Sequence, residues 1–307
     1  MKQRTLFAVD VGNTRVKIAR WLRGFPNPID PRARSSSPDA ECADPTADLD
    51  ETKRWLSDEA KCGDQSALWV VSSVSARKTV RLKELLASLR PQDACRLIEL
   101  DDLPIKVDYD YPEKLGIDRA VAAYAGLRIL PPKTPFLTID VGTAATIDYV
   151  DQNGVFRGGA ILPGPTLCAE ALTRKTDALP MIDDPENASL DGRTRRGALE
   201  YPATETNNAI RLGVVFTLVG AITAFYWKTR LTLEREGGNP NALRLLIAGG
   251  DATSTERNLN NYFDDMAANF GGTVPRPSIV VEPRLALYGL AELANDEARL
   301  KRKGLTL

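Results

Sequence analysis

The chain has 307 residues, a length that suggests two domains. Of these residues 43% are hydrophobic and 26% charged, a composition typical of a folded globular protein. The 40 basic and 41 acidic residues leave a net charge of -1, so no overall charge favours nucleic acid or an anionic membrane as a partner. The chain has no histidine, which excludes Ser-His-Asp and Cys-His catalysis and histidine-ligated metals. Acid–base chemistry must therefore use Asp, Glu, Lys, Tyr or Cys, or a bound ion.

Strands and helices are predicted to alternate along the first half of the chain. The expected strands are 5–9, 16–21, 67–74 and 96–100, and the expected helices are 52–60, 77–89 and 118–130. The segment Gly24 to Asp50 is rich in proline and contains three consecutive serines, so it is predicted to be a loop insertion or a disordered segment.

Strands are predicted in the second half over 136–139, 145–150, 155–161, 243–248 and 279–281, and helices over 207–236, 255–270 and 283–294. The segment Met181 to Pro202 is either a flap or a plain loop. The run Leu212 to Trp227 is nearly uncharged but only 16 residues long, whereas a membrane span needs roughly 20. We therefore expect it to be buried in the core or in a subunit interface.

The cysteines and the start of the chain indicate a cytoplasmic location. Cys42, Cys62, Cys95 and Cys168 are far apart and form no CxxC pair, which favours reduced thiols over a disulfide framework or a zinc site. The apolar run Leu6 to Val9 is broken by Asp10, so a signal peptide is not indicated.

One turn occurs twice, 130 residues apart. Phe7 to Thr14 and Leu137 to Ala144 both consist of an apolar strand, then Asp-Val-Gly, then threonine and small residues. Glycine allows a tight turn that exposes backbone N–H groups to an anion, and an Asp at the end of a strand can hold a metal ion. A single copy is more often an ordinary turn, but two copies favour the binding of a polyphosphate. No GxxxxGK[ST] sequence is present, so this is not a P-loop.

With four further motifs, these turns resemble the type III pantothenate kinases, members of the superfamily of acetate and sugar kinases, heat-shock proteins and actin. The segment Tyr109 to Arg119 resembles the YxxPxxLGxDR motif, and Asp140 to Asp148 resembles the second phosphate motif. Gly158 to Gly164, Thr176 to Pro180 and Ala248 to Asp251 resemble the GGxIxPG run, a conserved turn and the TGG adenosine motif.

The resemblance implies an α/β fold of two ribonuclease H-like (actin-like) domains with an interdomain cleft. Residues 1–130 would form the N-terminal domain, with the first phosphate loop and the insertion at 24–50. Residues 131–307 would form the C-terminal domain, with the second phosphate loop, the adenosine motif and an interface helix.

The implied activity is transfer of the ATP γ-phosphate to the 4′-hydroxyl of pantothenate, the first step of coenzyme A biosynthesis. Asp118 aligns with the catalytic base, although an Asp at a helix start can also be a plain N-cap. Asp10 would place Mg²⁺, and Asp140 would hold a monovalent cation, K⁺ or NH₄⁺. The expected ATP and phosphate contacts are Asp10, Val11, Gly12, Asn13, Thr14, Arg15, Val16, Lys17, Thr143, Gly249 and Gly250. Lys17 is equally compatible with an exposed lysine on a strand.

The pantothenate contacts implied by the resemblance are Tyr109, Gly116, Ile117, Asp118, Arg119 and Thr206. The threonine is the least certain alignment because the family's GxNT becomes Ala203-Thr204-Glu205-Thr206, and Thr194 is the alternative. Tyr109 could instead be a core aromatic residue, and Arg119 could form a surface ion pair.

The resemblance also implies a homodimer, with neither nucleic acid nor membrane as a partner. The apolar helix would contribute Phe216, Phe225 and Trp227 to the dimer contact. Two other functions remain open on the sequence: a non-catalytic transcriptional accessory homologue of the same fold, and a sugar or acetate kinase of the same superfamily.

Overall fold

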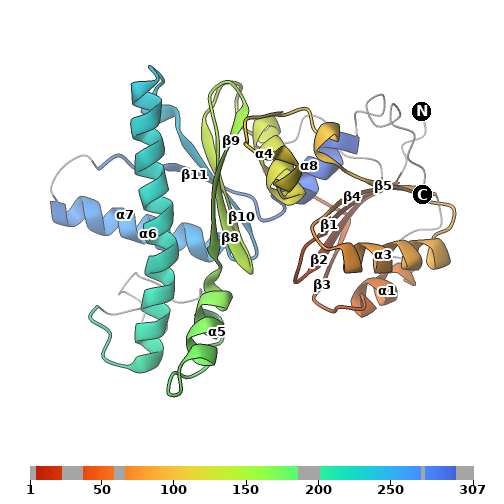
Figure 1. Cartoon of the computed structure of the whole chain (residues 1–307), viewed down its shortest axis with the longest axis horizontal. Helices are drawn as coiled ribbons and strands as arrows, with labels where there is room; N and C mark the ends of the chain where they lie inside the picture. The colour runs from red at the N-terminus through yellow and green to blue at the C-terminus, as the bar shows by residue number, and fades with distance from the viewer. Residues whose placement is uncertain (1–4, 23–36, 59–65, 186–200, 271–273, 295–307) are drawn as a thin grey trace. The chain divides into compact units, whose positions relative to one another are not determined.

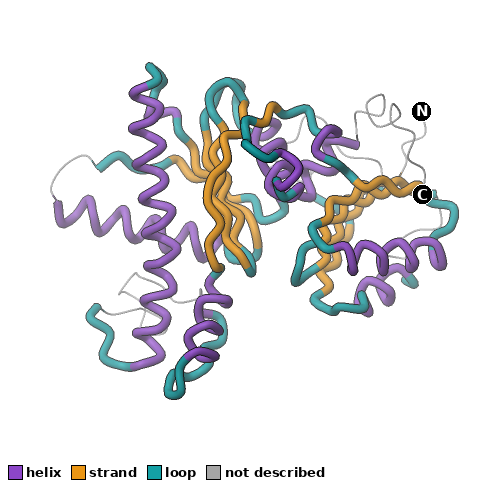
Figure 2. Tube along the Cα trace, in the orientation of Figure 1, coloured by secondary structure: helices purple, strands orange, loops and turns teal. Residues whose placement is uncertain are grey.

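The computed structural model describes residues 5–22, 37–58, 66–185, 201–270 and 274–294. The chain forms two compact units, which are described separately. The first consists of the residues up to Pro132 together with the segment that begins at Arg284, and the second is Lys133–Pro283. Figure 1 labels the elements of both units, and Figure 2 distinguishes their helices and strands.

The first unit is built on one mixed sheet. Its strands lie in the order β3-β2-β1-β4-β5. β1, β2 and β3 form an antiparallel meander, whereas β4 and β5 run parallel to β1. The bounds are β1 Thr5–Val11, β2 Val16–Trp21, β3 Ala40–Asp44, β4 Ala67–Ser73 and β5 Ala94–Leu97. The short strand β6 (Lys106–Val107) follows β5 in the chain and is not part of this sheet.

Helices cover both faces of this sheet. α1 (Asp50–Leu56) and α3 (Ala76–Leu89) pack on the face that carries Phe7, Val9 and Ile18. α4 (Ile117–Ile129) and α8 (Leu285–Ala294) pack on each other and on the strands, and Tyr288 of α8 contacts the Trp21 ring. Because side chains alternate along a strand, Trp21 and Ile18 lie on opposite faces. The second pair of helices therefore covers the opposite face from the first pair (Figure 1).

The second unit follows the same path. β7, β8 and β9 form an antiparallel meander, β10 and β11 run parallel to β7, and these strands lie in the order β11-β10-β7-β8-β9. The bounds are β7 Phe136–Val141, β8 Ala144–Val150, β9 Val155–Pro163, β10 Arg244–Gly249, β11 Ser278–Val281, α5 Pro165–Lys175, α6 Thr206–Arg235 and α7 Ala252–Phe270. Two units with this repeated strand order confirm the predicted ribonuclease H-like α/β class.

The long helix α6 contributes to the core of the second unit. Val215, Val219 and Ile222 are among its residues that pack on β7, β8 and β10. By length and composition α6 is the one described helix that could cross a membrane, and 44% of its most apolar window is buried inside the protein. The predicted buried helix is thus present, and its opposite side, which includes Phe216, is exposed.

Three elements depart from the sequence-based expectation. β3 lies inside the segment 24–50 that was predicted to be a loop or disordered, and that prediction is wrong for 40–44. Its Ala-Glu-Cys-Ala-Asp sequence has little β-propensity, and pairing with β2 makes it a strand at the sheet edge. Helix α5 was not predicted. α8 belongs to the first unit, although the sequence-based division assigned all of 131–307 to the second domain.

Candidate active site

The first phosphate-type turn is a four-residue connection between β1 and β2. Val11 pairs with Val16, and the Gly12 N–H donates to the Arg15 carbonyl at 3.0 Å. Asn13, Thr14 and Arg15 are exposed. The sequence thus places the peptide groups of a short hairpin at the carboxyl end of β1, where ligands commonly bind in α/β sheets.

Side chains from neighbouring strands gather around Asp10. The Ser72 hydroxyl of β4 donates to Asp10 Oδ1 at 3.0 Å. Lys17 of β2 is the cross-strand partner of Asp10, so their side chains lie next to each other on one face of the sheet. Lys17 is half-buried rather than exposed, which favours a role beside Asp10 over that of an exposed strand lysine.

Behind the turn lies a buried ammonium group. Lys78 of α3 is 6% exposed, and its Nζ donates to the Thr14 carbonyl at 2.7 Å. Burial lowers the pKa of Lys78, and the negative charge of Asp44 partly opposes this shift. Sequence reasoning missed Lys78, because only the pairing of β4 with β1 brings α3 to this turn.

The LGxDR segment forms the start of α4. The N-cap of this helix is Gly116, so the interpretation of Asp118 as the N-cap is wrong, and Asp118 lies in the first turn after Ile117. Asp118 Oδ1 accepts the Arg119 backbone N–H at 2.9 Å. A Cβ atom on Gly116 would lie 2.5 Å from this same oxygen, so the glycine leaves the room that the half-buried carboxylate occupies.

Arg119 and Tyr109 lie together. The Arg119 side chain is 7% exposed, and its guanidinium carbon lies 6.0 Å from the centroid of the Tyr109 ring. A guanidinium group over an aromatic face is held in a defined orientation. Because Arg119 is buried, it is not the exposed surface ion pair that the sequence allowed.

In the second unit, three glycine-containing turns meet at the end of β7. The Gly142 N–H donates to the Ala144 carbonyl at 3.1 Å, and the Gly164 N–H donates to the Thr143 carbonyl at 2.9 Å. A Cβ atom on Gly164 would lie 1.9 Å from the Gly142 carbonyl oxygen. The turn at Asp140–Thr143 is therefore packed directly against the start of α5.

The adenosine-type motif reaches the same turn from β10. Gly249 has φ +92, and a Cβ atom there would lie 2.2 Å from the Val141 carbonyl and 2.5 Å from Asp140 Oδ1. Gly250, by contrast, faces open space. The structure thus brings Asp140, Thr143 and Gly249 together within the second unit.

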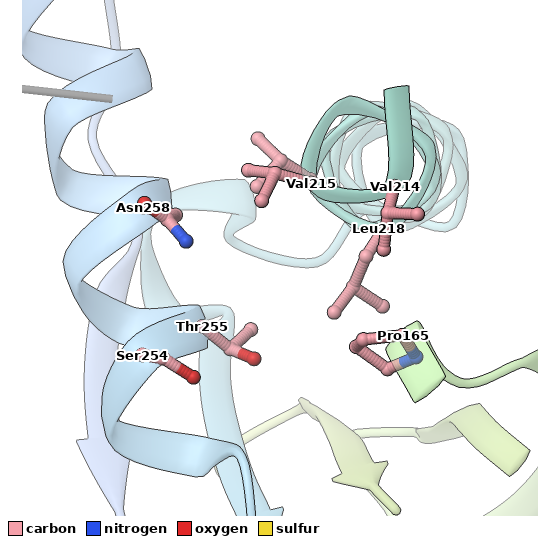
Figure 3. A pocket seen from close by; sticks show the side chains of 8 residues that line it. Pro165, Val214, Val215, Leu218, Ser254, Thr255 and Asn258 are labelled. Carbon is pink, nitrogen blue, oxygen red and sulfur yellow. The ribbon is translucent and has the colours of Figure 1, made fainter. Parts of the chain in front are cut away.

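A small, mainly apolar pocket lies between α6 and the start of α7, which follows this motif (Figure 3). Ser254 and Thr255 of α7 line one wall, and their hydroxyl groups donate to the Asp251 carbonyl at 2.9 and 2.8 Å. These bonds tie the turn after Gly250 to α7. The other lining residues are Pro165, Val214, Val215, Leu218, Val219 and Asn258.

Thr206 is the first residue of α6 and is exposed. The preceding Glu205 caps this helix by accepting the Asn207 and Asn208 N–H groups at 2.9 and 3.0 Å, and these bonds lower the pKa of Glu205. Thr194, the alternative, lies outside the described residues. The choice between the two threonines therefore rests on sequence alignment alone.

No group of three or more His, Cys, Asp and Glu side chains that could hold a metal ion occurs in the described part of the chain. The single carboxylates Asp10 and Asp140 still fit metal–nucleotide chemistry. Mg²⁺ in kinases is commonly held through one or two carboxylates, with water and substrate phosphates completing the set. Asp140 Oδ1 and the Val141 carbonyl oxygen both lie beside Gly249, and oxygen atoms of this kind are ligands for hard cations.

Comparison with known proteins identifies the family. The model of the family "Type III pantothenate kinase" matches residues 6–228. A type III pantothenate kinase from Bordetella bronchiseptica is 30% identical over 94% of this chain and 97% of its own length. One from Rubrobacter xylanophilus is 32% identical over 80% of this chain and 86% of its own. Another, from Rhodopirellula baltica, is 37% identical over 51% of each chain.

A solved structure supports the fold. A protein from Campylobacter jejuni described as a Baf family transcriptional activator matches over 95% of this chain and 98% of its own, with a TM-score of 0.50 and 18% identity. At that identity the likeness concerns the fold alone. The family model and the near full-length relatives show that this chain belongs to the type III pantothenate kinase family.

Proposed function

We infer that this chain is a pantothenate kinase, which transfers the γ-phosphoryl group of ATP to the hydroxyl group of pantothenate and forms 4′-phosphopantothenate. Membership of the family supports the activity. The observation that carries the assignment to residues is the start of α4, where Gly116 leaves room for the Asp118 carboxylate and Arg119 lies beside Tyr109.

Asp118 is the proposed catalytic base. The substrate hydroxyl oxygen attacks the γ-phosphorus, the bond from that phosphorus to the β–γ bridging oxygen breaks, and ADP leaves. The hydroxyl proton passes to the Asp118 carboxylate, as it does to the catalytic Asp of other kinases. Because the chain has no histidine, a carboxylate is the natural proton acceptor at neutral pH.

Arg119 and Tyr109 are the proposed anchors for pantothenate. A guanidinium group binds a carboxylate through two parallel hydrogen bonds, and pantothenate carries a carboxylate. The Tyr109 ring beneath its guanidinium group restricts the orientation of Arg119. Gly116, Ile117 and Thr206 complete the proposed set of substrate contacts.

The nucleotide contacts divide between the two turns. The backbone of the exposed residues Asn13, Thr14 and Arg15, together with Gly12 and Lys17, suits phosphate oxygens. Val11 and Val16 lie on either side of this turn. Thr143, Gly249 and Gly250 are the proposed contacts in the second unit. The open space at Gly250, where a Cβ atom would meet nothing within 4 Å, leaves room for a flat purine base to approach the backbone there.

Two ions are part of the proposal. Asp10 would hold Mg²⁺, and Asp140 would hold K⁺ or NH₄⁺. When bound, such ions neutralise phosphate charge. Asp10 is prepared for this role by the Ser72 hydroxyl, which fixes one carboxylate oxygen and hence the orientation of the other.

We further propose a homodimer that works in the cytoplasm. The exposed apolar side chains Ile161, Leu167 and Phe216 on β9, α5 and α6 support an interface on the second unit. Phe225 and Trp227, the other expected interface residues, pack partly on the core of this unit.

A non-catalytic accessory role is the less favoured function. It would not explain why the chain has both carboxylates of the kinase motifs, Asp10 and Asp118. A sugar or acetate kinase would not explain the LGxDR segment.

The deciding experiment is a coupled assay with purified protein, ATP, Mg²⁺, K⁺ and pantothenate. We expect phosphopantothenate to form, and Asp118→Asn to lower kcat by about 10²–10⁴-fold with little change in KM. Glu113→Gln removes an exposed carboxylate just before α4 and serves as the matched control. A folded wild-type protein that forms no product contradicts the function, whereas full turnover by Asp118→Asn contradicts only the base.

A further inference from the structure

The position of Lys78 is unfavourable by two separate criteria. Its ammonium group is buried, which removes the charge from water. It also lies in the first turn of α3, three residues after the N-cap Ser75, where the helix dipole disfavours a positive charge. A residue whose position is unfavourable for the stability of the fold is commonly part of a functional site.

The contact that Lys78 makes is with the first phosphate-type turn. Its Nζ lies 2.7 Å from the Thr14 carbonyl oxygen. In a trans peptide group, C=O and N–H point in opposite directions. A Thr14 carbonyl turned toward Lys78 therefore turns the Arg15 N–H away from Lys78, to the other side of the turn.

The nearby carboxylate has other partners. Asp44 accepts hydrogen bonds from the Thr46 N–H, the Thr46 hydroxyl and the Thr52 N–H at 2.8, 2.6 and 2.7 Å. It is fully buried and acts on Lys78 through its charge. The hydrogen bonds of Asp44 thus hold the connection between β3 and α1 in place. The hydrogen bond of Lys78 instead holds the turn between β1 and β2.

We propose that Lys78 is a positioning residue for ATP, which fixes the first phosphate loop through the Thr14 carbonyl and places a positive charge behind it. The proposal rests on the proposed function in one respect, namely that this loop binds the phosphates of ATP. Lys78 acts through the peptide group between Thr14 and Arg15. Its charge adds to that of Lys17 without itself having to reach the nucleotide.

The test compares the binding of ATP and adenosine by calorimetry, because adenosine lacks the phosphates that the loop would hold. Lys78→Met keeps the length of the side chain and removes both donor and charge. We expect it to weaken ATP binding by about tenfold, the typical effect of one charged hydrogen bond. Adenosine binding should change less than about twofold, since the adenosine contacts proposed here lie in the second unit.

Kinetics and two further variants complete the test. KM for ATP should rise in parallel, with KM for pantothenate unchanged, and Lys78→Arg, which keeps donor and charge, should recover part of the ATP affinity. Lys83→Met, a half-buried lysine on the same helix, is the matched control and should bind ATP like the wild type.

Three outcomes would overturn the proposal. In the first, Lys78→Met binds ATP as the wild type does. In the second, it loses ATP and adenosine affinity equally, and in the third neither Lys78 variant folds, so that the residue serves stability alone. A wild-type protein that binds ATP but leaves pantothenate unphosphorylated contradicts the proposed function instead, and the comparison of the two ligands still decides the role of Lys78.

Discussion

Single glycines determine how closely the turns of the candidate site approach each other. Gly116 makes room for the Asp118 carboxylate, while Gly164 and Gly249 lie against the carbonyl groups of Gly142 and Val141. In each case a side chain would occupy space that an oxygen atom already fills. Gly164 and Gly249 therefore require glycine because a backbone carbonyl group approaches each of them, and Gly249 also requires it for its backbone angle, whereas a side chain at Gly116 would displace the Asp118 carboxylate.

Gly164→Ala is predicted to disturb the turn at Asp140–Thr143. The new Cβ would lie 1.9 Å from the Gly142 carbonyl oxygen, so either this turn or the start of α5 must move. We expect ATP binding to weaken by at least about tenfold, since the backbone of the turn is the proposed ligand-binding group. Calorimetry with ATP checks this.

The matched control for that variant is Gly220→Ala on α6. A Cβ atom there meets nothing within 4 Å, and alanine in a helix interior is more stable than glycine by roughly 0.5–1 kcal/mol. ATP affinity should stay at the wild-type level. Equal ATP affinity in Gly164→Ala and Gly220→Ala would show that the contact at Gly164 does not shape the site.

Much of the site at residue scale could be predicted from the sequence, because its motifs are continuous. Asp10, Asp118 and Asp140 each lie inside a short run that defines its own local structure. Lys78 and Ser72 could not be found in this way, since they reach the first turn only through the pairing of β4 with β1. The partners that sequence reasoning missed are those that depend on tertiary contacts.

At the scale of elements, periodicity predicted strands and helices with a strong apolar pattern. The helices expected over 77–89 and 118–130 are present with nearly the expected bounds. β3 and α5 were missed because their sequences carry weak patterns: β3 consists of two alanines, a cysteine and two acidic residues, and α5 begins at Pro165. Proline in the first turn of a helix is common, but the Pro163-Gly164-Pro165 run first suggests a loop.

The β8–β9 hairpin gives a prediction about pH. Asp151 is buried, which alone would raise its pKa, but hydrogen bonds from the Val155 and Asn153 N–H groups and from Arg157 lower it overall. A carboxylate with a lowered pKa stabilises the fold above its unfolded pKa of about 3.9, and this stabilisation is lost as the pH falls through the folded pKa.

Asp151→Asn should therefore unfold more easily than the wild type at pH 7, by about 1–3 kcal/mol. The difference should begin to shrink as the pH falls below about 4, where the carboxyl of the unfolded chain takes up a proton, and it should be smallest once the pH is below the lowered pKa of the folded state. Urea unfolding at several pH values measures it. Asp265→Asn, at an exposed position on α7, is the control and should show no such difference from the wild type. A difference in the free energy of unfolding between Asp151→Asn and the wild type that stays constant down to pH 2 would contradict the lowered pKa of Asp151.

At the scale of the whole molecule, the two units repeat one order of five strands, and the sequence shows this repeat more clearly at the turns than at the domain boundaries. The two Asp-Val-Gly turns occupy the same place in this order, at the end of β1 and of β7. The chain nevertheless leaves the second unit at Pro283, and α8 completes the first unit. A linear division at residue 130 could not reveal this, because the packing of α8 on α4 and β1 is a long-range contact.

The proposed dimer gives the prediction at this scale. Phe216 on α6 is 41% exposed, although a large aromatic side chain gains more free energy when it is buried. If α6 forms the dimer interface, Phe216→Glu places a charge in a desolvated contact, which is strongly unfavourable. We expect this variant to be a monomer in light scattering at micromolar concentration, with the circular dichroism of the wild type.

Val80→Glu is the control for Phe216→Glu, because Val80 on α3 of the first unit is an apolar side chain that is 57% exposed. It should stay dimeric, which separates the effect of one face from that of any added surface charge. A Phe216→Glu variant that is still a dimer would show that the interface does not include this face of α6. A wild-type protein that is a monomer would contradict the dimer itself, while the kinase assay would still decide the activity.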